Sequence, residues 1–467
     1  MYLTNKYMME FMQRRHMMKM NLSLNQITTF LSLTISVLLV NVCINNISLT
    51  NIAHADNHSK NWNQWRGPNN DGISHAKDAP TEWSQTENVR WRLPLPGEGA
   101  STPVVWQDKI FLTSADEGPP EEPFDETKIV LMCVSTAGEI QWKRTLSDNN
   151  RGSRGDEVNY AAPSPATDGK HVWAFIGNGT LVCYDFQGEL VWNINLEKRY
   201  GRFRLGFLMS STPLLYKDKL YITLIHSGAW LVIALDKKTG NEIWKHDRQS
   251  DATRECEHAY TSPILYKDAN HEFLVVHGAD YVTAHSLDDG SEIWRCGGLN
   301  PIFNYNPSFR LVASPVATEG LIVVPTAKNG PVVGLAPNGK GDITDTEWQI
   351  WKLHNGTPDV PSPLIHDGLV YLCRENGDLI CLDAKTGDLL YRERTHRHRH
   401  RSSPIYANGH IYLTARDGVV NVVKAGRDFE IVATNSIDEP VAASPVIVDG
   451  TLYLRSYDAL YAISQKK

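Results

Sequence analysis

The chain lacks most of the short motifs that mark a catalytic or metal-binding protein. Its 467 residues include seven cysteines, and no two of them are adjacent or spaced as Cys-x-x-Cys. This excludes zinc-finger spacings and the Cys-x-x-Cys-His attachment site of c-type haem. There is no His-Glu-x-x-His and no Gly-x-Ser-x-Gly, so the usual signatures of zinc peptidases and α/β-hydrolases are missing too. A catalytic triad without a sequence signature stays open.

Long helical patterns and long hydrophobic runs are also scarce. One apolar run, at residues 30–42, follows the basic residues Arg14, Arg15 and Lys19 and precedes Ala53-His-Ala55. These are the three parts of a secretory signal peptide. We therefore predict a signal peptide over residues 1–55, cleavage after Ala55 and export; the alternative is an uncleaved N-terminal anchor. The run is too short and too polar at its flanks to predict a membrane span. The bulky Val42 argues against lipid attachment at Cys43.

An excess of positive charge is missing as well. The formal net charge of −7 becomes −10 when residues 1–55, with four Lys or Arg and one Glu, are removed to leave a chain starting at Asp56. An acidic exported protein is a poor match to the phosphate backbone of nucleic acids. We therefore expect no nucleic-acid partner, and we expect a monomer.

What the chain has in abundance is one hairpin pattern. It reads Ala234-Leu-Asp-Lys-Lys-Thr-Gly-Asn-Glu-Ile-Trp244, and it returns nearly unchanged at residues 381–391 and shortened at residues 286–294. Asp and Thr side chains can bond turn amides, and Gly240 can adopt positive φ. The aromatic residue offers a large apolar plate to a neighbouring sheet. The pattern predicts a structural clasp rather than a binding site.

The cysteines follow the same repeat. Cys133, Cys183 and Cys381 stand where other repeats carry Ala234 and Ala284, so we interpret them as small core residues. For Cys256 and Cys296 two states are open: a disulfide formed in an oxidising compartment, or two free thiols.

A second repeated mark is a small hydroxyl residue followed by proline. After each occurrence come an apolar run, a turn that usually contains Asp or Gly, and a second apolar run. Four short strands in roughly 40–60 residues make one blade of a β-propeller. The mark occurs eight times, at Thr102, Ser164, Thr212, Ser262, Ser314, Ser362, Ser403 and Ser444.

The number of blades follows from the eight repeats and from the strand that completes the last of them. The eighth repeat ends before its fourth strand, and residues 88–93 offer that strand at the other end of the mature chain. We predict an all-β, eight-bladed β-propeller of four-stranded blades, closed by this N-terminal strand. It would occupy residues 56–467, with a lead-in at 56–87 and blades at 100–465. The docking aromatics are Trp91, Trp142, Trp192, Trp244, Trp294, Trp351 and Tyr391, with Val432 in the seventh repeat.

These repeats resemble the tryptophan-docking motif of pyrroloquinoline-quinone (PQQ) repeats. The resemblance covers about residues 62–465 and implies the fold of quinoprotein alcohol dehydrogenases and of the outer-membrane assembly factor BamB, both eight-bladed. The opening, Trp62-Asn-Gln-Trp-Arg-Gly-Pro-Asn-Asn-Asp-Gly72 with Trp83-Ser84, also resembles the start of exported bacterial PQQ-repeat proteins. A shared fold does not imply a shared activity.

Candidate binding residues lie in the long connections between blades. We expect these loops to meet on one face of the ring and to bind an anionic or polar ligand, with arginines pairing to its carboxylates or acidic and amide oxygens holding Ca²⁺. The alternative is that they are solvated loops whose charges pair locally. The candidates are Glu157, Asn159, Arg202, Arg204, Glu257, His258, Asn304, Arg310, His396, His398 and His400.

The most conspicuous cluster is Thr395-His-Arg-His-Arg-His-Arg401. In an extended chain the three histidines would project to one side and the three arginines to the other. Three imidazoles could bind a transition metal, and three arginines could hold a polyanion. The third interpretation is an exposed basic loop.

Two main functions follow from the resemblance. The first is a BamB-like scaffold that presents its loop face to a protein or polymer; polymer recognition would use Tyr160, Tyr200, Phe203, Tyr260, Phe303 and Tyr305. The alternative is a dehydrogenase that oxidises alcohols or sugars with PQQ and Ca²⁺ as cofactors. The resembling dehydrogenases use a pair of adjacent cysteines beside the cofactor, and this chain has none. We therefore assign no catalytic residue and no cofactor from the sequence, and we expect a scaffold.

Overall fold

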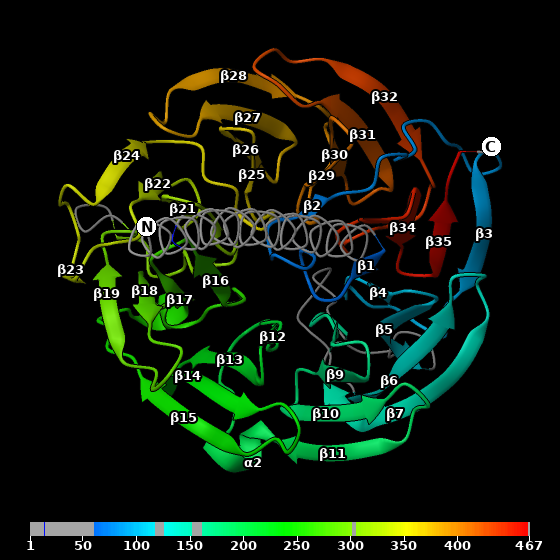
Figure 1. Cartoon of the computed structure of the whole chain (residues 1–467), viewed down its shortest axis with the longest axis horizontal. Helices are drawn as coiled ribbons and strands as arrows, with labels where there is room; N and C mark the ends of the chain where they lie inside the picture. The colour runs from blue at the N-terminus through cyan, green and yellow to red at the C-terminus, as the bar shows by residue number, and fades with distance from the viewer. Residues whose placement is uncertain (1–13, 15–59, 117–125, 152–160, 301–304, 466–467) are drawn as a thin grey trace, which may run out of the picture. The chain divides into compact units, whose positions relative to one another are not determined.

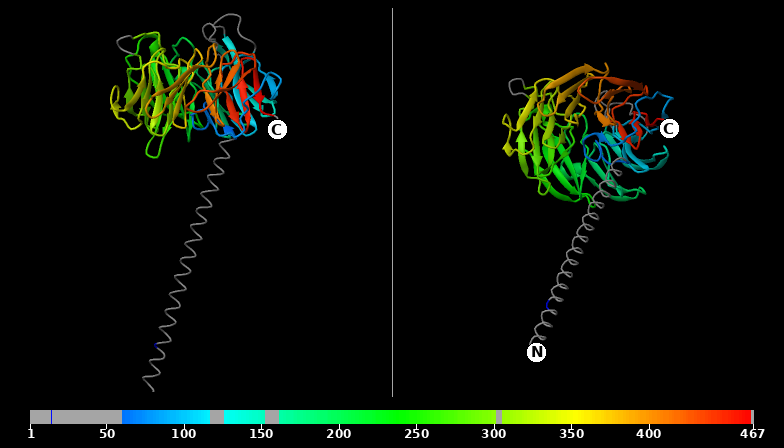
Figure 2. Two further views of the ribbon diagram at one scale, coloured as in Figure 1. Left: turned by 90° about the horizontal axis from the view of Figure 1, so that it is seen from above. Right: turned by 45° about the horizontal axis from the view of Figure 1, so that its top comes forward.

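The computed structural model describes residues 14, 60–116, 126–151, 161–300 and 305–465. Apart from Arg14, the predicted signal peptide lies outside the described residues. Residues Ser59–Lys467 form one compact unit, in which the strands make eight sheets around a common centre (Figure 1), and the side view in Figure 2 shows the same ring. The prediction of an all-β, eight-bladed propeller is confirmed. No helix in the described part of the chain has the length and apolar character of a membrane span.

Each of the first four blades is a meander of neighbouring antiparallel strands, with two additions. Strand β1 joins the inner side of blade 1, and β23 joins the outer side of blade 4. The strands of blade 1 are β1 (Asn61–Trp62), β4 (Val104–Trp106), β5 (Lys109–Asp116), β6 (Glu126–Ser135) and β7 (Ile140–Arg151); of blade 2, β8 (Ala166–Thr167), β9 (His171–Phe175), β10 (Thr180–Asp185) and β11 (Leu190–Asn195); of blade 3, β12 (Leu214–Tyr216), β13 (Lys219–His226), β14 (Ala229–Asp236) and β15 (Glu242–Asp247); of blade 4, β16 (Ile264–Lys267), β17 (Glu272–Gly278), β18 (Tyr281–His285), β19 (Glu292–Cys296) and β23 (Gly341–Asp342).

The remaining blades repeat the arrangement, and β2 joins the inner side of blade 7. Two short helices, α2 (Leu196–Tyr200) and the 3₁₀ helix η1 (Arg254–Glu257), lie in connections between blades. The strands of blade 5 are β20 (Val316–Thr318), β21 (Leu321–Pro325), β22 (Val332–Leu335) and β24 (Gln349–Leu353); of blade 6, β25 (Leu364–His366), β26 (Leu369–Cys373), β27 (Asp378–Asp383) and β28 (Leu389–Arg394); of blade 7, β2 (Ile73–Ser74), β29 (Ile405–Ala407), β30 (His410–Thr414), β31 (Val419–Lys424) and β32 (Ile431–Ser436); of blade 8, β33 (Val446–Val448), β34 (Thr451–Arg455), β35 (Ala459–Ile463) and β3 (Val89–Pro94).

The closing strand is present. Strand β3 pairs antiparallel with β35, with Val89 opposite Ile463 and Pro94 opposite Ala459. Its bounds differ by one residue from the predicted 88–93. This pairing supplies the fourth strand of blade 8 from the other end of the propeller, so the ring closes and the edge of β35 is covered.

The middle strands of a blade carry long buried stretches because they lie between two neighbouring blades. Residues Leu220–His226 of β13 and Leu231–Leu235 of β14 are all buried, because each blade packs between two neighbours and both faces of its sheet are covered. The outer strand β3 instead alternates between half-buried and exposed residues. The core is accordingly a series of clusters between blades, as where Leu214 and Tyr221 of blade 3 pack with Leu274 and Val276 of blade 4.

Tryptophans of the outer strands join each blade to the next. Six of them donate the indole N–H to a main-chain oxygen of the following blade at 2.9–3.1 Å. Trp244, for example, bonds to Leu287, and its ring lies so close to Gly290 that a Cβ there would be 2.4 Å away. The six donors are Trp91, Trp142, Trp192, Trp244, Trp294 and Trp351.

The last two aromatic positions differ. Tyr391 packs against Phe429 at 5.6 Å, and its buried hydroxyl has no hydrogen-bond partner among the described residues. In the seventh blade Ala433, not Val432, lies opposite Val422 in the place of the tryptophan. The assignment of Val432 was wrong by one residue, because the connection from Val422 to Ala433 is one residue longer than the connection from Ala234 to Trp244.

The eight hydroxyl residues form a closed ring of hydrogen bonds, which we call the hydroxyl ring. The main-chain N–H of each one donates to the side-chain oxygen of its counterpart in the next blade, and Ser444 donates to Thr102 to complete the circle. The eight distances lie between 2.9 and 3.2 Å. The ring therefore links all eight blades at the centre of the propeller.

Replacing one member of the hydroxyl ring by alanine should destabilise the propeller. In Ser314→Ala the buried N–H of Ser262, which donates to Ser314 at 2.9 Å, loses its acceptor. We expect the free energy of unfolding in urea to fall by about 1–3 kcal/mol. Ser314→Thr is the matched control, since threonine already serves at positions 102 and 212. Equal losses for the two variants would contradict the role assigned to the hydroxyl.

The two faces of the ring are different. The connections between blades and the turns between second and third strands share one face, which we call the loop face. The other face, here the turn face, carries the turns between first and second strands and those between third and fourth strands, including the turn of the Ala234-to-Trp244 hairpin. This follows from the antiparallel order of every blade.

The lead-in segment, residues 61–74, crosses the centre of the ring on the turn face. Strand β1 pairs with β4 of blade 1, and β2 pairs with β29 of blade 7; both lie near the centre in Figure 1. Between them, Gln64 accepts the N–H of Leu215 in blade 3 at 3.1 Å. The buried Arg66 donates to the main-chain oxygens of Pro363 and Pro404 in the connections leading to blades 6 and 7. The lead-in thus joins blades on opposite sides of the ring.

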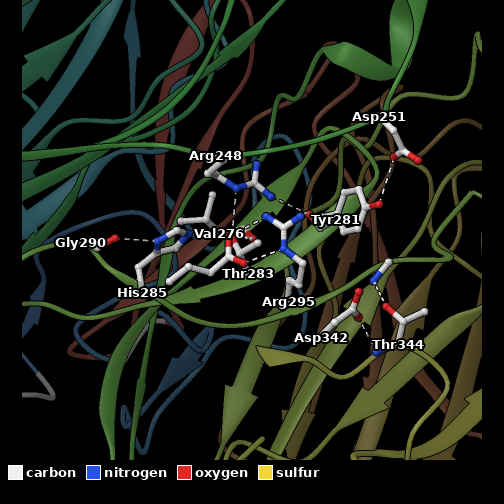
Figure 3. A network of polar contacts seen from close by, with 12 residues as sticks. Arg248, Asp251, Val276, Tyr281, Thr283, His285, Gly290, Arg295, Asp342 and Thr344 are labelled. Carbon is white, nitrogen blue, oxygen red and sulfur yellow. Dashed lines mark hydrogen bonds and ion pairs between the residues drawn. The ribbon is translucent and has the colours of Figure 1, made fainter. Parts of the chain in front are cut away.

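A second buried arginine ties blade 3 to blade 4. Arg248 follows β15 and is 1% exposed. Its guanidinium donates to Thr283 at 3.0 Å and to the Tyr281 oxygen at 3.1 Å (Figure 3). It also donates to the Gly278 oxygen at 3.2 Å. Thr283 in turn contacts His285 at 2.8 Å. Burial lowers the pKa of Arg248 to about 10, so the side chain stays protonated at neutral pH.

Candidate functional site

A cavity of about 170 Å³ lies at the centre of the propeller. All eight members of the hydroxyl ring line it, together with Trp65 of the lead-in. Further lining residues come from the loop-face connections and turns: Phe207, Tyr260, Arg310, Arg401, Arg416 and Tyr457. None of the described residues that line the cavity is an aspartate or a glutamate. The described lining is therefore rich in hydroxyl groups and contains three arginines.

Arg310 is the predicted site residue that the fold brings into this cavity. Its guanidinium lies over the rings of Phe207 at 4.5 Å and Tyr260 at 5.8 Å, which fixes its plane by cation–π contact. Its ion pair with Glu255 is long, at 3.5 Å. The buried Nε atom of Arg310 has no hydrogen-bond partner among the described residues. Burial raises the pKa of Tyr260 to about 12, so its hydroxyl keeps its proton.

Arg202 and Arg204 lie elsewhere on the loop face, in the connection between α2 and β12. Both side chains are exposed. Arg202 lines a wide groove beside blade 2, and the main-chain oxygen of Arg204 accepts the N–H of Ser227 at 3.1 Å. These two arginines do not line the central cavity.

Glu257 and His258 lie at the end of η1. The main-chain oxygen of Glu257 accepts the indole N–H of Trp230 at 3.2 Å. The Nε2 atom of His258 is 2.9 Å from the Ser227 hydroxyl, but its buried Nδ1 has no hydrogen-bond partner among the described residues. Burial lowers the pKa of His258. A serine–histidine pair whose second ring nitrogen is not oriented by a carboxylate lacks the third member of a catalytic triad.

The three histidines of the His/Arg run lie close together without forming a metal site. His396 is 2.8 Å from Asp417, and its ring centre is 6.5 Å from those of His398 and His400. His400 is fully buried, which lowers its pKa to about 4. Within the described ranges no three His, Cys, Asp or Glu side chains are grouped so as to hold a metal ion. The geometry does not support the metal-binding interpretation.

The arginines of the same run are paired with an acidic side chain. Arg399 and Arg401 reach Glu375 at 2.9 and 3.4 Å. Asp359 lies beside this pair, and burial, with a hydrogen bond to Glu375, raises its pKa to about 6. Asp359, Glu375 and Arg399 line a second cavity of about 400 Å³, and Lys328, which also lines it, is 3.7 Å from Asp359. The run is therefore not an extended strand with histidines on one side and arginines on the other.

Three predicted site residues, Glu157, Asn159 and Asn304, lie outside the described residues, as do Tyr160 and Phe303. The other aromatics proposed for polymer recognition do not share one platform. Tyr200 donates to Glu242 at 2.6 Å, Phe203 is buried, and Tyr305 donates to Asp280 at 2.7 Å.

The cavity does not fit a calcium-bound PQQ cofactor. Ca²⁺ takes six to eight oxygen ligands, and some of these are usually carboxylates. The described lining of the cavity contains no carboxylate. The six described cysteines are buried and free, Cys256 and Cys296 included, and none of them lines the cavity. A volume of about 170 Å³ is also small against the roughly 300–1,000 Å³ of sites that enclose cofactors and drug-sized ligands.

Some lining residues could have been found from the sequence and others could not. Along a strand, residues two apart point the same way, so the position two before each ring hydroxyl should also face the centre. This rule identifies Tyr260 before Ser262 and Arg401 before Ser403. Arg416 and Tyr457 come from turns between second and third strands, and no repeated signal marks them.

Comparison with known proteins agrees with the architecture. The family model of the outer membrane protein assembly factor BamB matches residues 124–246, 180–342 and 339–465. No curated protein sequence matches the chain. BamB from Moraxella catarrhalis is 15% identical with a TM-score of 0.57, over 81% of this chain and 97% of that chain.

Two quinoprotein structures are similar as well. A europium-containing methanol dehydrogenase is 13% identical with a TM-score of 0.65, over 88% of this chain and 92% of that chain. The quinohemoprotein alcohol dehydrogenase from Comamonas testosteroni is 12% identical with a TM-score of 0.61, over 89% and 82%. Identities this low show the shared fold alone. Because the family model spans most of the propeller, this chain belongs to the BamB family of PQQ-repeat β-propellers.

Proposed function

We propose that the protein is an exported scaffold that binds a protein partner on its loop face. The observation that carries this proposal is a groove of about 1,040 Å³ on that face, beside blade 2. Apolar and amide side chains both line it: Leu146, Ile194, Leu205 and Leu208, with Asn149, Asn178, Asn193 and Asn195. Apolar contacts with a few well-placed hydrogen-bonding groups are typical of sites that bind extended peptide segments.

The walls of this groove are held by the fold. The Asn195 side chain accepts the N–H of Lys198 at the start of α2 at 2.9 Å and donates to the Asn178 oxygen at 3.0 Å. Leu208 has a φ of 58°, a conformation that a branched side chain rarely adopts. Such strain is kept where the surrounding structure demands it, often in binding sites. A pre-formed groove loses little conformational freedom on binding, which favours affinity.

A protein partner fits better than a polysaccharide. Carbohydrate polymers are usually bound on exposed aromatic rings. Of the aromatics predicted to bind a polymer, Phe203 is buried, and Tyr200 and Tyr305 donate hydrogen bonds to different elements. The dehydrogenase hypothesis gains no support from the described cavity lining, which has no carboxylate for calcium. We further propose that the signal peptide over residues 1–55 is cleaved after Ala55, so that the protein works outside the cytoplasm beside the envelope proteins that the family name indicates.

Site-specific crosslinking tests this function. A photoreactive amino acid at Leu205, in the groove, should yield a discrete adduct with an envelope protein in intact cells, and the exposed Arg202→Glu should weaken it. The matched control places the same amino acid at Lys385, exposed on the turn face, where no adduct is expected.

Two outcomes would overturn the proposal. Identical adducts from positions 205 and 385 would show contact without specificity. Stoichiometric binding of PQQ with Ca²⁺ and dye-linked oxidation of alcohols or aldoses by the purified mature protein would establish the dehydrogenase function instead.

A further inference from the structure

One residue in the first strand of each blade turns its main-chain N–H and C=O toward the centre of the ring. In an antiparallel pair, every second residue directs these groups away from the partner strand. In all eight blades this residue stands two places after the proline of the hydroxyl–proline mark, and we call it the axial position. The axial positions are Val105, Thr167, Leu215, Leu265, Ala317, Ile365, Tyr406 and Ile447.

The lead-in segment covers five axial positions. On the far side of the ring from its start, Gly72 accepts the N–H of Tyr406 at 2.9 Å, and the hydroxyl of Ser74 donates to the Ile447 oxygen at 2.6 Å. In blades 1 to 3 the lead-in uses one residue per blade. Trp62 pairs with Val105, the Asn63 oxygen accepts the N–H of Thr167 at 2.8 Å, and the Gln64 side chain accepts the N–H of Leu215 at 3.1 Å.

The axial positions of blades 4 and 5 have no such cover. Among the described residues, neither Leu265 nor Ala317 makes a main-chain hydrogen bond outside its own sheet. Both residues are half-buried, whereas four of the five axial residues that the lead-in covers are at most 8% exposed. In blade 6, Arg66 donates to the nearby Pro363 oxygen, and Ile365 is only 6% exposed. The open sector of the ring is therefore that of blades 4 and 5.

A pocket of about 390 Å³ lies at these two positions. Leu265 and Ala317 line it, and the exposed residues Lys267 and Thr318 lie where the strands run into the turns of the turn face. Its volume falls within the range of pockets that enclose small ligands. An edge strand with unpaired N–H and C=O groups pairs readily with another extended chain. The lining residues are 64, 68–71, 214–216, 265–267 and 317–319.

We infer that this turn-face pocket binds a short extended peptide segment of another protein, whose main chain pairs with Leu265 and Ala317. The lead-in supports this mode of binding, because an extended chain already serves the equivalent positions of blades 1 to 3. It does not continue into the pocket itself, since Arg66 reaches across to Pro363. Main-chain hydrogen bonds would supply affinity, and side-chain contacts with the lining, such as Pro68, would supply specificity.

This pocket is separate from the groove beside blade 2, which lies on the loop face, and its occupation does not depend on the partner proposed above. The two sites share no lining residue. A ligand of one can therefore be distinguished from a ligand of the other.

Selection from a phage-displayed library of random heptapeptides tests the inference on the purified mature protein. Phage that also bind Thr318→Trp are discarded, because a bulky side chain at this lining position fills the pocket but leaves the groove intact. We expect peptides that survive this step and bind at one saturable site in titration calorimetry, at least about tenfold more weakly to Thr318→Trp. The matched control, Lys385→Trp, is exposed on the turn face of blade 6 and should bind as the unchanged protein does. The inference is overturned if no peptide survives.

A second variant tests whether the main chain is recognised. Ala317→Pro removes the N–H that faces the pocket, and proline is tolerated where a strand edge is unpaired. It should weaken peptide binding about two- to tenfold, the effect of one lost hydrogen bond, whereas Ala317→Gly keeps the N–H and should bind as the unchanged protein does. Equal affinity of the two variants contradicts main-chain pairing and overturns the inference.

Amide hydrogen exchange gives a measurement that needs no variant. Bound peptide should slow exchange of the Leu265 and Ala317 amides at least about tenfold, and exchange in residues 193–195 of the groove should stay as it is in the free protein. Exchange at Leu265 and Ala317 that is not slowed, or slowed exchange in the groove instead, overturns the inference even if Ala317→Pro does not fold.

Discussion

Trp244→Ala is expected to lower the free energy of unfolding by roughly 3–5 kcal/mol, the range found when a buried Trp or Phe is truncated to alanine. The side chain is 8% exposed, lies in the cluster between blades 3 and 4 and donates its indole N–H to Leu287 at 3.1 Å. Truncation would leave a void beside Gly290, while the Leu287 oxygen would keep its second donor, the Nζ atom of Lys219 at 2.8 Å. Urea unfolding followed by tryptophan fluorescence and circular dichroism measures the loss.

The neighbouring residue gives the control for this prediction. Ile243 is on the same strand but 43% exposed, so Ile243→Ala should change stability by no more than about 0.5 kcal/mol, as most surface substitutions do. Folded Trp244→Ala should also keep its groove crosslink. A variant with normal stability but weakened binding would show that the tryptophan serves a ligand rather than the clasp.

Arg248→Ala should destabilise the propeller by a similar amount, about 3–5 kcal/mol. The guanidinium donates three hydrogen bonds to oxygens of blade 4, two of which, to Thr283 and Tyr281, can be followed in Figure 3, and hydrogen bonds from a charged donor contribute about 1.5–3 kcal/mol each. Part of this gain is offset in the native protein because a cation is buried. Arg248→Ala removes that penalty but leaves a void and unpaired oxygens.

An exposed arginine shows how much of this effect comes from burial. Arg427→Ala removes a surface ion pair with Asp383 at 3.0 Å and should cost no more than about 1 kcal/mol. If Arg248→Ala proved as mild as Arg427→Ala in urea unfolding, the buried arginine would not be the link between blades 3 and 4 that its contacts indicate.

Both positions stabilise contacts between blades, whereas the groove and the cavity mouth lie on the loop face. The residues that stabilise the propeller therefore differ from the residues of the proposed binding site. This separation explains why the repeated hairpin of residues 234–244 indicates the fold but not a ligand.

The fold could be predicted because the same sequence patterns recur in each blade. The hairpin of residues 234–244 and the hydroxyl–proline marks recur at regular spacing, and the gap after the last repeat predicts β3. The error at Val432 has a local cause. The hairpin that follows Val422 is one residue longer than the hairpin of residues 234–244, so Ala433 takes the tryptophan position, and the length of a turn is fixed only by the pairing of its two strands.

The site was predicted less well, and the reason is geometric. Of the candidates, the structure brings Arg310 into the central cavity, while Arg202, Arg204, Glu257 and His258 lie along other parts of the loop face and His400 is buried. Loops follow no periodic pattern, so their residues can be named from sequence but not assigned to a common point.

By itself the sequence determined the strands, the docking tryptophans and the eight blades, because these depend on local patterns that repeat. Only the tertiary structure decided that the eight hydroxyl residues close a ring around a cavity, that residues 61–74 cross its turn-face end, and that Arg310, Arg401 and Arg416 gather at the other. Those residues are far apart along the chain, and they meet because ring closure brings the inner edge of every blade to the same axis.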